Sequence, residues 1–546
     1  MARRRDPGMV SFDVSSDNET EGADGGAPAG PHGPHGPAGP GQGDGWFVRR
    51  VGRPAARRWS AVPRRARRIT VTATAAVLVL GTGAAVAVDH HLDTEHAERL
   101  AAAPGGVVDL SAPVEPTWEV ASDHGVLAVL PGGVVVTTAG SEVLAVEAAS
   151  GAEVWRHDLG VQPDCGPRQR TPADLTRPVD RIVCLSGAPS RTVTVVDASG
   201  DVLGQRDIGP AATTQDEQMA GQGDGHVRAA VPAAGGAVAV LERSDLVLDS
   251  AISPAEAFAV LEEHRAEGTW RDPVLRIEDA RTGEVRAEET LEVGRDDLEG
   301  CGLGSWSDEP GGQVWLTAHL GAEPAGTALS FCGLGVWIAA DGTVQDAFPR
   351  RTVDGDLLEY TEEGTRIISG DDADDDVVLP GFVLEPHATD GTEGPFVAHD
   401  GDGALAAFDR SGERLWTKDM TVWDVLARAG GTVVVSGEAS GLTGLDLATG
   451  EELWSRDDLV EGAGGYGVPG TGGAVTDGTV VAVVVPGDPR LVALDLADGS
   501  TRWSADGEAA TGLVAVDGHL LEHDAGGIPS GGRSAATVEG VLRGLG

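Results

Sequence analysis

The fold of this chain is decided by a short repeated stretch, which in its clearest copy reads Leu442-Thr-Gly-Leu-Asp446-Leu-Ala-Thr-Gly450-Glu-Glu-Leu-Trp454. An apolar segment leads to an acidic residue, a Gly turn and a second segment that ends on Trp. Side chains that alternate before the turn indicate a strand with two different faces. Asp can hydrogen-bond its own turn backbone, and Gly takes positive φ without steric cost. The stretch therefore predicts a β-hairpin.

Six further copies of this stretch occur in the sequence. Their turn glycines are Gly151, Gly200, Gly283, Gly342, Gly412 and Gly499. A Trp lies four residues after the glycine in four of the seven copies, as Trp155, Trp416, Trp454 and Trp503, whereas Gly204, Ala287 and Asp346 occupy that place in the other three. A large ring at a fixed place in each repeat suits a wedge between stacked sheets.

The repeat resembles the PQQ-like β-propeller repeat family, which includes quinoprotein dehydrogenases and the propeller lipoprotein of the outer-membrane assembly machine. The resemblance covers about residues 117–546 and implies an all-β propeller, whose four-stranded blades take roughly 40–50 residues each. The larger spacings between copies imply insertions. An ordinary β-sandwich built from hairpins is the alternative.

The ends of the repeat region predict how the ring closes. Pro116-Thr-Trp118-Glu-Val120 is a Trp strand without a partner before it, and residues 537–545 resemble the strand that precedes a turn. Joining them completes one blade from distant segments and leaves no open sheet edge. We therefore expect eight blades, with Trp118 beside residues 537–545; seven blades is the alternative if Trp118 lies far from them.

The region before the repeats is divided by composition. Residues 1–46 are rich in Gly, Pro and acids and predict a disordered cytoplasmic arm. Residues 47–68 carry nine Arg and no acid. Residues 69–88 are uncharged and about as long as a membrane-spanning helix, and residues 89–116 form an acidic linker to the propeller at 117–546.

Arg before the uncharged run and acids after it predict a single-pass anchor, with the N-terminus in the cytoplasm and the propeller outside it. A secretory signal with a cleavage site at Ala85-Val86-Ala87 is the alternative. The 68 residues that precede the run are far more than a signal peptide carries, and they favour the uncleaved anchor.

The region beyond the uncharged run is strongly acidic, with 79 acidic and 28 basic residues. Such a charge repels nucleic acid and anionic membrane surfaces. It fits either a partner rich in cations or an acidic surface that keeps the protein soluble. The expected partners are therefore proteins or components of the cell envelope, and no nucleic acid is expected.

The four cysteines agree with an oxidising compartment. Cys165 and Cys184 fall in the second repeat unit, and Cys301 and Cys332 fall in the fourth. Four cysteines allow three pairings. Local pairing within each unit is favoured, because a propeller blade contacts mainly itself and its neighbours.

Two insertions interrupt the repeats. Within residues 204–272, Ser253-Pro254-Ala-Glu256 reads as an N-cap, a Pro in the first turn and a capping-box Glu, and Gly268 is a stop signal. We expect a short helix there, which either covers an apolar seam or contacts a partner. The second insertion, residues 347–400, contains the acidic run 371–376, which reads as a solvated loop or a calcium site.

The search for catalytic chemistry finds none. Asp400-Gly-Asp402-Gly is a second possible calcium loop, and Gly462-Ala-Gly464-Gly-Tyr-Gly467 matches a dinucleotide motif but lacks the following helix. In quinoprotein enzymes a disulfide between adjacent cysteines covers the quinone and Asn helps to hold calcium. This chain has no adjacent cysteines, and its single Asn is Asn18.

The sequence therefore predicts a membrane-anchored propeller that acts as a binding scaffold, with no catalytic residues and no cofactor. The alternatives are a dehydrogenase of alcohols or sugars that depends on the quinone PQQ and calcium, and a calcium-dependent envelope sensor.

Overall fold

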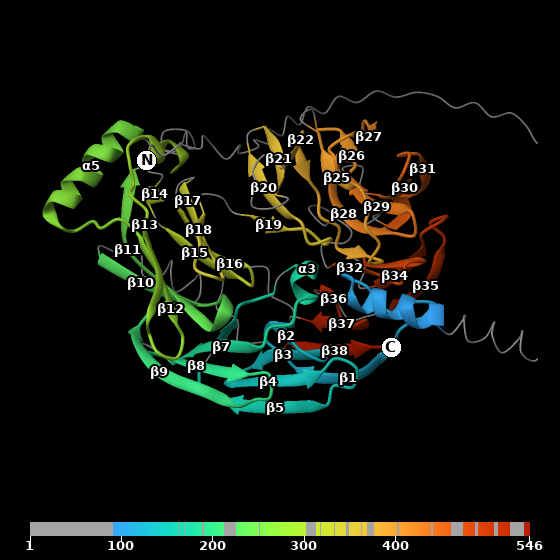
Figure 1. Ribbon diagram of the computed structural model, residues 1–546, viewed down its shortest axis with the longest axis horizontal. Coiled ribbons are helices and arrows are strands. Elements are labelled where there is room, and N and C mark those ends of the chain that lie inside the picture. Colours follow the sequence, from blue (N-terminus) through green and yellow to red (C-terminus); the bar gives the residue numbers. More distant parts are fainter. Residues whose placement is uncertain are drawn as a thin grey trace, which may run out of the picture. The chain divides into compact units, whose positions relative to one another are not determined.

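The computed structural model describes residues 91–546 except 162, 170, 188–189, 212–224, 250–251, 302–312, 317, 332–333, 346–348, 362, 369–375, 401–402, 438–440, 460–472, 486–489, 507–511 and 525–539. The described residues from 96 to 546 belong to the larger of its two compact units. The larger unit is all-β apart from short helices and is built of antiparallel sheets that follow one another along the chain (Figure 1).

Each of the first four sheets contains four consecutive strands. The first is β2 (Ala128–Leu130), β3 (Val134–Ala139), β4 (Glu142–Glu147) and β5 (Glu153–Asp158); the second is β6 (Asp164–Gly166), β7 (Arg181–Ser186), β8 (Ser190–Asp197) and β9 (Val202–Pro210). The third is β10 (Gly225–Ala233), β11 (Ala237–Asp249), β12 (Val274–Asp279) and β13 (Val285–Thr290), and β14 (Gln313–Leu316) pairs with the end of β11. The fourth is β15 (His319–Glu323), β16 (Gly326–Phe331), β17 (Leu334–Ala339) and β18 (Val344–Gln345).

The next four sheets follow the same plan. The fifth is β19 (Arg350–Arg351), β20 (Leu357–Thr361), β21 (Gly364–Ile368) and β22 (Val377–Leu379); the sixth is β23 (Phe382–Val383), β25 (Phe396–His399), β26 (Leu405–Phe408) and β27 (Arg414–Lys418). The seventh is β28 (Val422–Ala429), β29 (Thr432–Gly437), β30 (Leu442–Asp446) and β31 (Glu452–Arg456), with β24 (Ala388–Thr389) parallel to β28. The eighth is β32 (Ala474–Thr476), β33 (Val480–Val484), β34 (Arg490–Asp495) and β35 (Thr501–Asp506).

The last sheet joins distant parts of the chain, as the sequence predicts. It contains β36 (Gly512–Val516), β37 (His519–Asp524), β38 (Val541–Leu545) and, outermost, β1 (Pro116–Ala121). Trp118 lies opposite Gly544 in the register of β1 and β38. The predicted hybrid blade is therefore confirmed.

The expected number of eight blades, with seven as the alternative, is wrong, because the described residues form nine sheets. The extra sheet is β19–β22, inside the insertion predicted at 347–400. Its strands have two to five residues and carry no Gly-to-Trp stretch. The acidic run occupies the place in the sequence, between β21 and β22, where other sheets have their Asp–Gly turn. The repeat pattern in the sequence therefore does not indicate this blade.

The repeat tryptophans join each sheet to the next. The Trp454 ring packs on Gly499 of the following sheet, at 2.7 Å or less from where a Cβ on that glycine would stand, and its Nε1 donates to the Leu496 carbonyl at 2.9 Å. Trp118, Trp155 and Trp416 make the same two contacts with Gly151, Gly200 and Gly450 and their turns. Only glycine leaves room for the ring there and also takes the positive φ of these turns.

Trp503 is the exception, because the last sheet has no such turn next to it. Its Nε1 donates to the carbonyl of Leu110 at 2.6 Å. Residues 91–102 are helical, and the segment after them bonds to inner strands of the ring: Val107 donates to the Thr476 carbonyl, and Val108 to that of Gly518. Leu100 and Leu110 are fully buried. The interval expected as a linker thus includes a segment packed on the propeller.

The Asp of the repeat stabilises its own turn. Asp446 Oδ1 accepts hydrogen bonds from the backbone of Ala448 and from the backbone and hydroxyl of Thr449, at 2.8–3.1 Å. The Thr449 hydroxyl and these amides hold the pKa of the Asp446 carboxyl below its usual range. The acidic side chains of the repeats therefore stabilise their turns.

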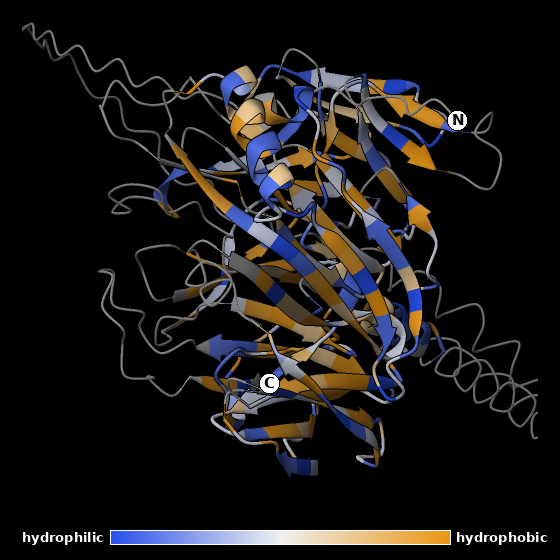
Figure 2. Cartoon of the chain, turned by 90° about the vertical axis from the view of Figure 1, so that its left-hand side faces the viewer, coloured by the Kyte–Doolittle hydropathy of each residue, from blue (hydrophilic) through white to orange (hydrophobic). Residues whose placement is uncertain are grey.

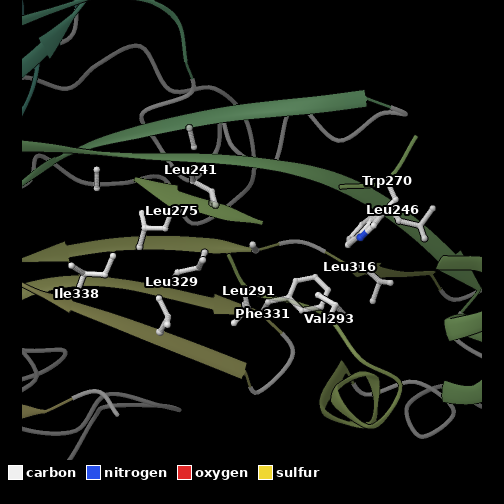
Figure 3. Close-up of a cluster of buried hydrophobic side chains, with 14 of the residues drawn as sticks. Leu241, Leu246, Trp270, Leu275, Leu291, Val293, Leu316, Leu329, Phe331 and Ile338 are labelled. Atoms are coloured by element: carbon white, nitrogen blue, oxygen red, sulfur yellow. The ribbon is translucent and has the colours of Figure 1, made fainter. Parts of the chain in front are cut away.

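The predicted helix is confirmed as α5 (Pro254–Glu267). Ser253 and Glu256 form the capping box, and Gly268 ends the helix at φ 74°. Its buried Ala257 and Leu261 belong to the largest apolar cluster, which also takes side chains from the third and fourth sheets (Figure 3). The helix therefore covers the seam between those sheets. The insertion predicted at 204–272 also holds β10 and β11, so much of it is blade.

Apolar and polar residues alternate along many strands (Figure 2), as expected for sheets that pack face to face. Short helical turns occur at α3 (Pro172–Leu175), η1 (Ala234–Gly236), η2 (Asp296–Cys301) and η4 (Asp457–Leu459). Within the described part of the chain, no helix has both the length and the hydropathy required to cross a membrane. The expected arm, Arg-rich segment and anchor at 69–88 lie outside the described residues.

Candidate functional site

The turn between β19 and β20, residues 352–356, gathers charged side chains from several sheets. Two local hydrogen bonds close the turn. The Gly355 amide donates to the Thr352 carbonyl at 3.0 Å, and the Asp356 amide donates to the Thr352 hydroxyl at 3.0 Å. Gly355 has a φ of 95°, which an L side chain would strain. Asp354 and Asp356 both lie on this turn. We call residues 352–356 the inner turn.

The two carboxylates of the inner turn are paired with arginines of later sheets. Arg428 of β28 approaches Asp354 at 2.5 Å, and both side chains are more than nine-tenths buried. Arg410, from the turn before β27, lies 3.2 Å from Asp354 and 2.7 Å from Asp356. A buried pair of this kind fixes relative positions more than it adds stability, because desolvation offsets the attraction. The network therefore holds the fifth, sixth and seventh sheets in register.

Glu385 lies beside this network on the segment after β23. Its Oε2 accepts the Val353 amide at 2.9 Å. Burial raises the pKa of Glu385 to about 7, opposed by that amide and by the Arg428 charge and reinforced by Asp354 and Asp356. At neutral pH this carboxyl is therefore partly protonated, in contrast to the turn acids of the repeats.

A small pocket separates Glu385 from Arg428. Its volume of about 10 Å³ is room for about one water molecule, and Leu384, Phe396 and Val425 contribute apolar walls. The buried Nε of Arg428 has no hydrogen-bond acceptor among the described residues. The pocket is too small for a quinone ring system.

Two more arginines reach the inner turn, and neither has a carboxylate in contact among the residues that the structure describes. Arg351 Nη1 donates to the Gly355 carbonyl at 2.7 Å, while its buried Nε has no acceptor in the described part of the chain. Arg177, which follows α3 in the second sheet, brings Nη2 to 3.6 Å from where a Cβ on Gly355 would stand. In Figure 1, α3 lies beside β36 of the last sheet.

Exposed aromatic side chains occur on the first strands of the sixth and seventh sheets. Trp423 of β28 is 55% exposed and Phe382 of β23 is 44% exposed. Next to Trp423, Asp424 pairs with His387 at 2.7 Å. Both strands also contribute to the pocket beside Glu385, so the aromatic side chains and the charged network share the same pair of blades.

The residues predicted as sites lie elsewhere and have structural roles. Cys165 and Cys184 are bonded, with 4.1 Å between their Cα atoms, and this pairing is confirmed. The second predicted pair includes Cys332, which lies outside the described residues, so Cys301–Cys332 stays a prediction. The five repeat tryptophans lie between sheets and none belongs to the inner turn network.

The predicted calcium loops fall largely outside the described residues, as do Asp402 and Gly462–Gly467. Asp400 is described, and its Oδ1 accepts the Ala404 amide at 3.0 Å within its own turn. Among the described residues no three His, Cys, Asp or Glu side chains are grouped so as to hold a metal ion.

The inner turn was missed by sequence reasoning because its members come from separate segments. Arg177, Arg351, Glu385 and Arg428 share no motif and no spacing. The one available signal was the insertion at 347–400, which contains the turn and Glu385. Interpreting that segment as an insertion between blades left out the sheet that brings these residues together.

Comparisons with known proteins agree with the fold. Residues 337–527 match the family model described as Outer membrane protein assembly factor BamB. This part of the chain carries PQQ-like repeats. No curated protein matches the chain.

Solved structures of two kinds are similar to the chain. BamB from Moraxella catarrhalis is 13% identical, with a TM-score of 0.36 and coverage of 79% of this chain and 99% of that one. The quinohemoprotein alcohol dehydrogenase from Comamonas testosteroni is 14% identical, with a TM-score of 0.36 and coverage of 79% and 76%. At this identity and overlap, neither likeness carries an argument about function.

Proposed function

We propose that this protein is a membrane-anchored, extracytoplasmic propeller that binds a partner protein through the blades that carry Trp423 and Phe382. The observation that carries the proposal is the exposure of Trp423. The family matched by residues 337–527 is described as an assembly factor, and a binding role for this chain accords with that description.

Trp423 differs from the other tryptophans whose side chains the structure describes. The four buried repeat tryptophans are 6–8% exposed, and Trp270 and Trp337 are 3–4% exposed. An indole ring left more than half in water keeps a large apolar area available for contact. Tryptophan is also enriched among the residues that dominate binding energy at protein interfaces. Phe382 adds a second exposed ring on the neighbouring sheet.

The charge of the chain indicates the kind of partner. Residues 89–546 carry 79 acidic and 28 basic residues, so association with a basic surface is accelerated and association with an acidic one is opposed. The Asp424–His387 pair adjacent to Trp423 supplies a polar rim to the aromatic contact. We therefore propose a partner with a basic surface around an apolar pocket.

Site-specific photocrosslinking in native membranes tests this function. A photoreactive amino acid at position 423 should yield one defined crosslinked protein, and the W423A variant of the chain should lose co-purification of that protein. The matched control is position 202, where Val202 is 46% exposed on the outer strand β9. The same crosslinked protein from position 202, or undiminished co-purification with W423A, would contradict the proposal.

The membrane anchor is part of the same proposal and rests on the nine Arg of residues 47–68 followed by the uncharged run 69–88.

Catalysis is not proposed. The inner turn offers charged groups that bind or position, and none of them is a nucleophile placed beside a base. No observation on this chain favours the quinone-dependent dehydrogenase.

A further inference from the structure

We infer that Arg177 and Arg351, which both reach Gly355 of the inner turn, form a binding site for a phosphate group. The inference goes beyond the proposed partner binding and does not rest on it. It starts from an unusual placement, since the fold brings two guanidinium groups from separate blades to one glycine, and neither has a carboxylate in contact within the described part of the chain.

The placement follows from the contacts at Gly355. Arg351 is held from its own sheet, since its Nη1 donates to the Gly355 carbonyl. Arg177 reaches the same glycine from the second sheet, with its Nη2 3.6 Å from the position a Cβ would take. The two guanidinium groups are close enough that, besides burial, the charge of Arg351 lowers the pKa of Arg177.

The donors of the pair are largely uncommitted. Among the described residues, the buried Nε of Arg351 has no acceptor and the guanidinium of Arg177 has no hydrogen bond or ion pair. Unpaired buried donors cost free energy, and an anion with several oxygens would satisfy them. The guanidinium of Arg177 is also exposed, so a ligand can reach the pair from solvent.

The charge balance favours phosphate over a single carboxylate. Asp354 and Asp356 are already paired with Arg410 and Arg428. Burial and the nearby charge of Arg351 lower the pKa of Arg177, and Asp174 offsets only part of this effect. Neither Arg177 nor Arg351 has a carboxylate in contact among the described residues, so no ion pair there neutralises their positive charges. A phosphate monoester carries about −1.5 to −2 charges at pH 7 and three acceptor oxygens, which suit two arginine forks.

Calorimetric titration of inorganic phosphate into the purified full-length chain in non-ionic detergent tests the site. The variants are R177Q and R351Q, and the control is R350Q. Arg350 adjoins Arg351 in sequence, is exposed and lies over the Tyr360 ring, so its loss changes the net charge equally without touching the inner turn. Each site variant should weaken phosphate binding by about ten- to a hundredfold, as for the loss of a charged hydrogen bond, and R350Q should leave it within about twofold.

Three further measurements make the result decisive. The unfolding midpoint without phosphate shows whether each variant folds. If R351Q does not fold, the result for R177Q decides, because Arg177 is exposed and its replacement should leave the fold intact. R351K keeps the charge but loses the planar fork, and binding should still weaken. Titration of glycerol 3-phosphate tells whether the natural ligand is a phosphate ester or the free ion. Tighter binding than that of free phosphate assigns the site to an ester, and weaker binding assigns it to the free ion.

The inference is overturned if the wild-type chain binds no phosphate, or if R177Q and R350Q bind it equally. Acetate should bind at least tenfold more weakly than phosphate, and equal affinities would overturn the choice of phosphate. Crosslinking at position 423 does not depend on these titrations. The phosphate site can therefore be refuted without refuting the binding of a partner protein, and the reverse also holds.

Discussion

Replacing Glu385 with Gln should remove a pH dependence from the stability of this protein. The ordinary pKa of 4.5 applies to the unfolded chain, and the folded pKa is about 7. The folded state therefore holds this proton more tightly. Below pH 4.5 both states are protonated and the carboxyl costs nothing. As the pH rises from 4.5 through 7, the unfolded state loses its proton first, and the free energy of unfolding falls.

The size of this fall follows from the two pKa values. At about 1.36 kcal/mol per pKa unit, the wild-type chain should lose about 3 kcal/mol by pH 8 relative to acid solution. Gln keeps an acceptor for the Val353 amide and carries no proton in this range. The E385Q variant should therefore gain stability over the wild type as the pH rises, most of it between pH 5 and 7.

Urea unfolding followed by tryptophan fluorescence at pH 5, 6, 7 and 8 measures this difference. Subtracting the two proteins at each pH cancels the contributions of the other carboxyls. E413Q is the control, because Glu413 is exposed on the turn before β27, and it should match the wild type at every pH. The reasoning is refuted if the difference between E385Q and wild type stays within about 0.5 kcal/mol from pH 5 to 8.

Further predictions address the disulfide, the tryptophan contacts, the topology and the chemistry. Replacing Cys165 and Cys184 with Ser should cost about 3 kcal/mol for a loop of 19 residues, measured by urea unfolding, and an unchanged midpoint would contradict it. G450A should lower the unfolding midpoint more than G431A: both positions have positive φ, but only the Gly450 site faces a tryptophan ring, and equal losses would exclude that contact as the cause. A C-terminal reporter that requires export should be active if residues 69–88 are an anchor, and activity of a cytoplasm-only reporter would rule this out. The purified chain should oxidise no alcohol or sugar when quinone and calcium are added, and saturable oxidation needing both would overturn the binding role.

The local signals of the sequence were sufficient for most of the fold. A repeated Asp–Gly–Trp pattern specifies a hairpin and a contact between sheets, so the blades that carry it could be predicted from residues a few positions apart. The same holds for α5, whose N-cap, first-turn Pro and terminal Gly are all local. The hybrid blade was predictable because Trp118 is a repeat residue that lacks the rest of its repeat.

The fifth sheet and the inner turn could not be predicted in this way. Strands β19–β22 are short and lack the pattern, so their sheet is specified by packing against its neighbours. The charged network depends on that packing, since Arg177 and Arg428 come from distant parts of the chain and both reach the inner turn. Pairs without a shared motif leave no periodic signal in a single sequence.

The pairing of β1 with β38 also sets the order in which the protein can fold. Eight sheets use strands that are near one another in the chain, whereas Trp118 and Gly544 are separated by more than 420 residues. Closing a loop of that length costs about 5 kcal/mol of chain entropy in an ideal chain, and the contacts that repay it form only when both strands are present. The hybrid sheet therefore forms last. Until then β1 has no partner and β38 presents an open edge, and this interval is when the nascent protein is most exposed to aggregation and most in need of a chaperone.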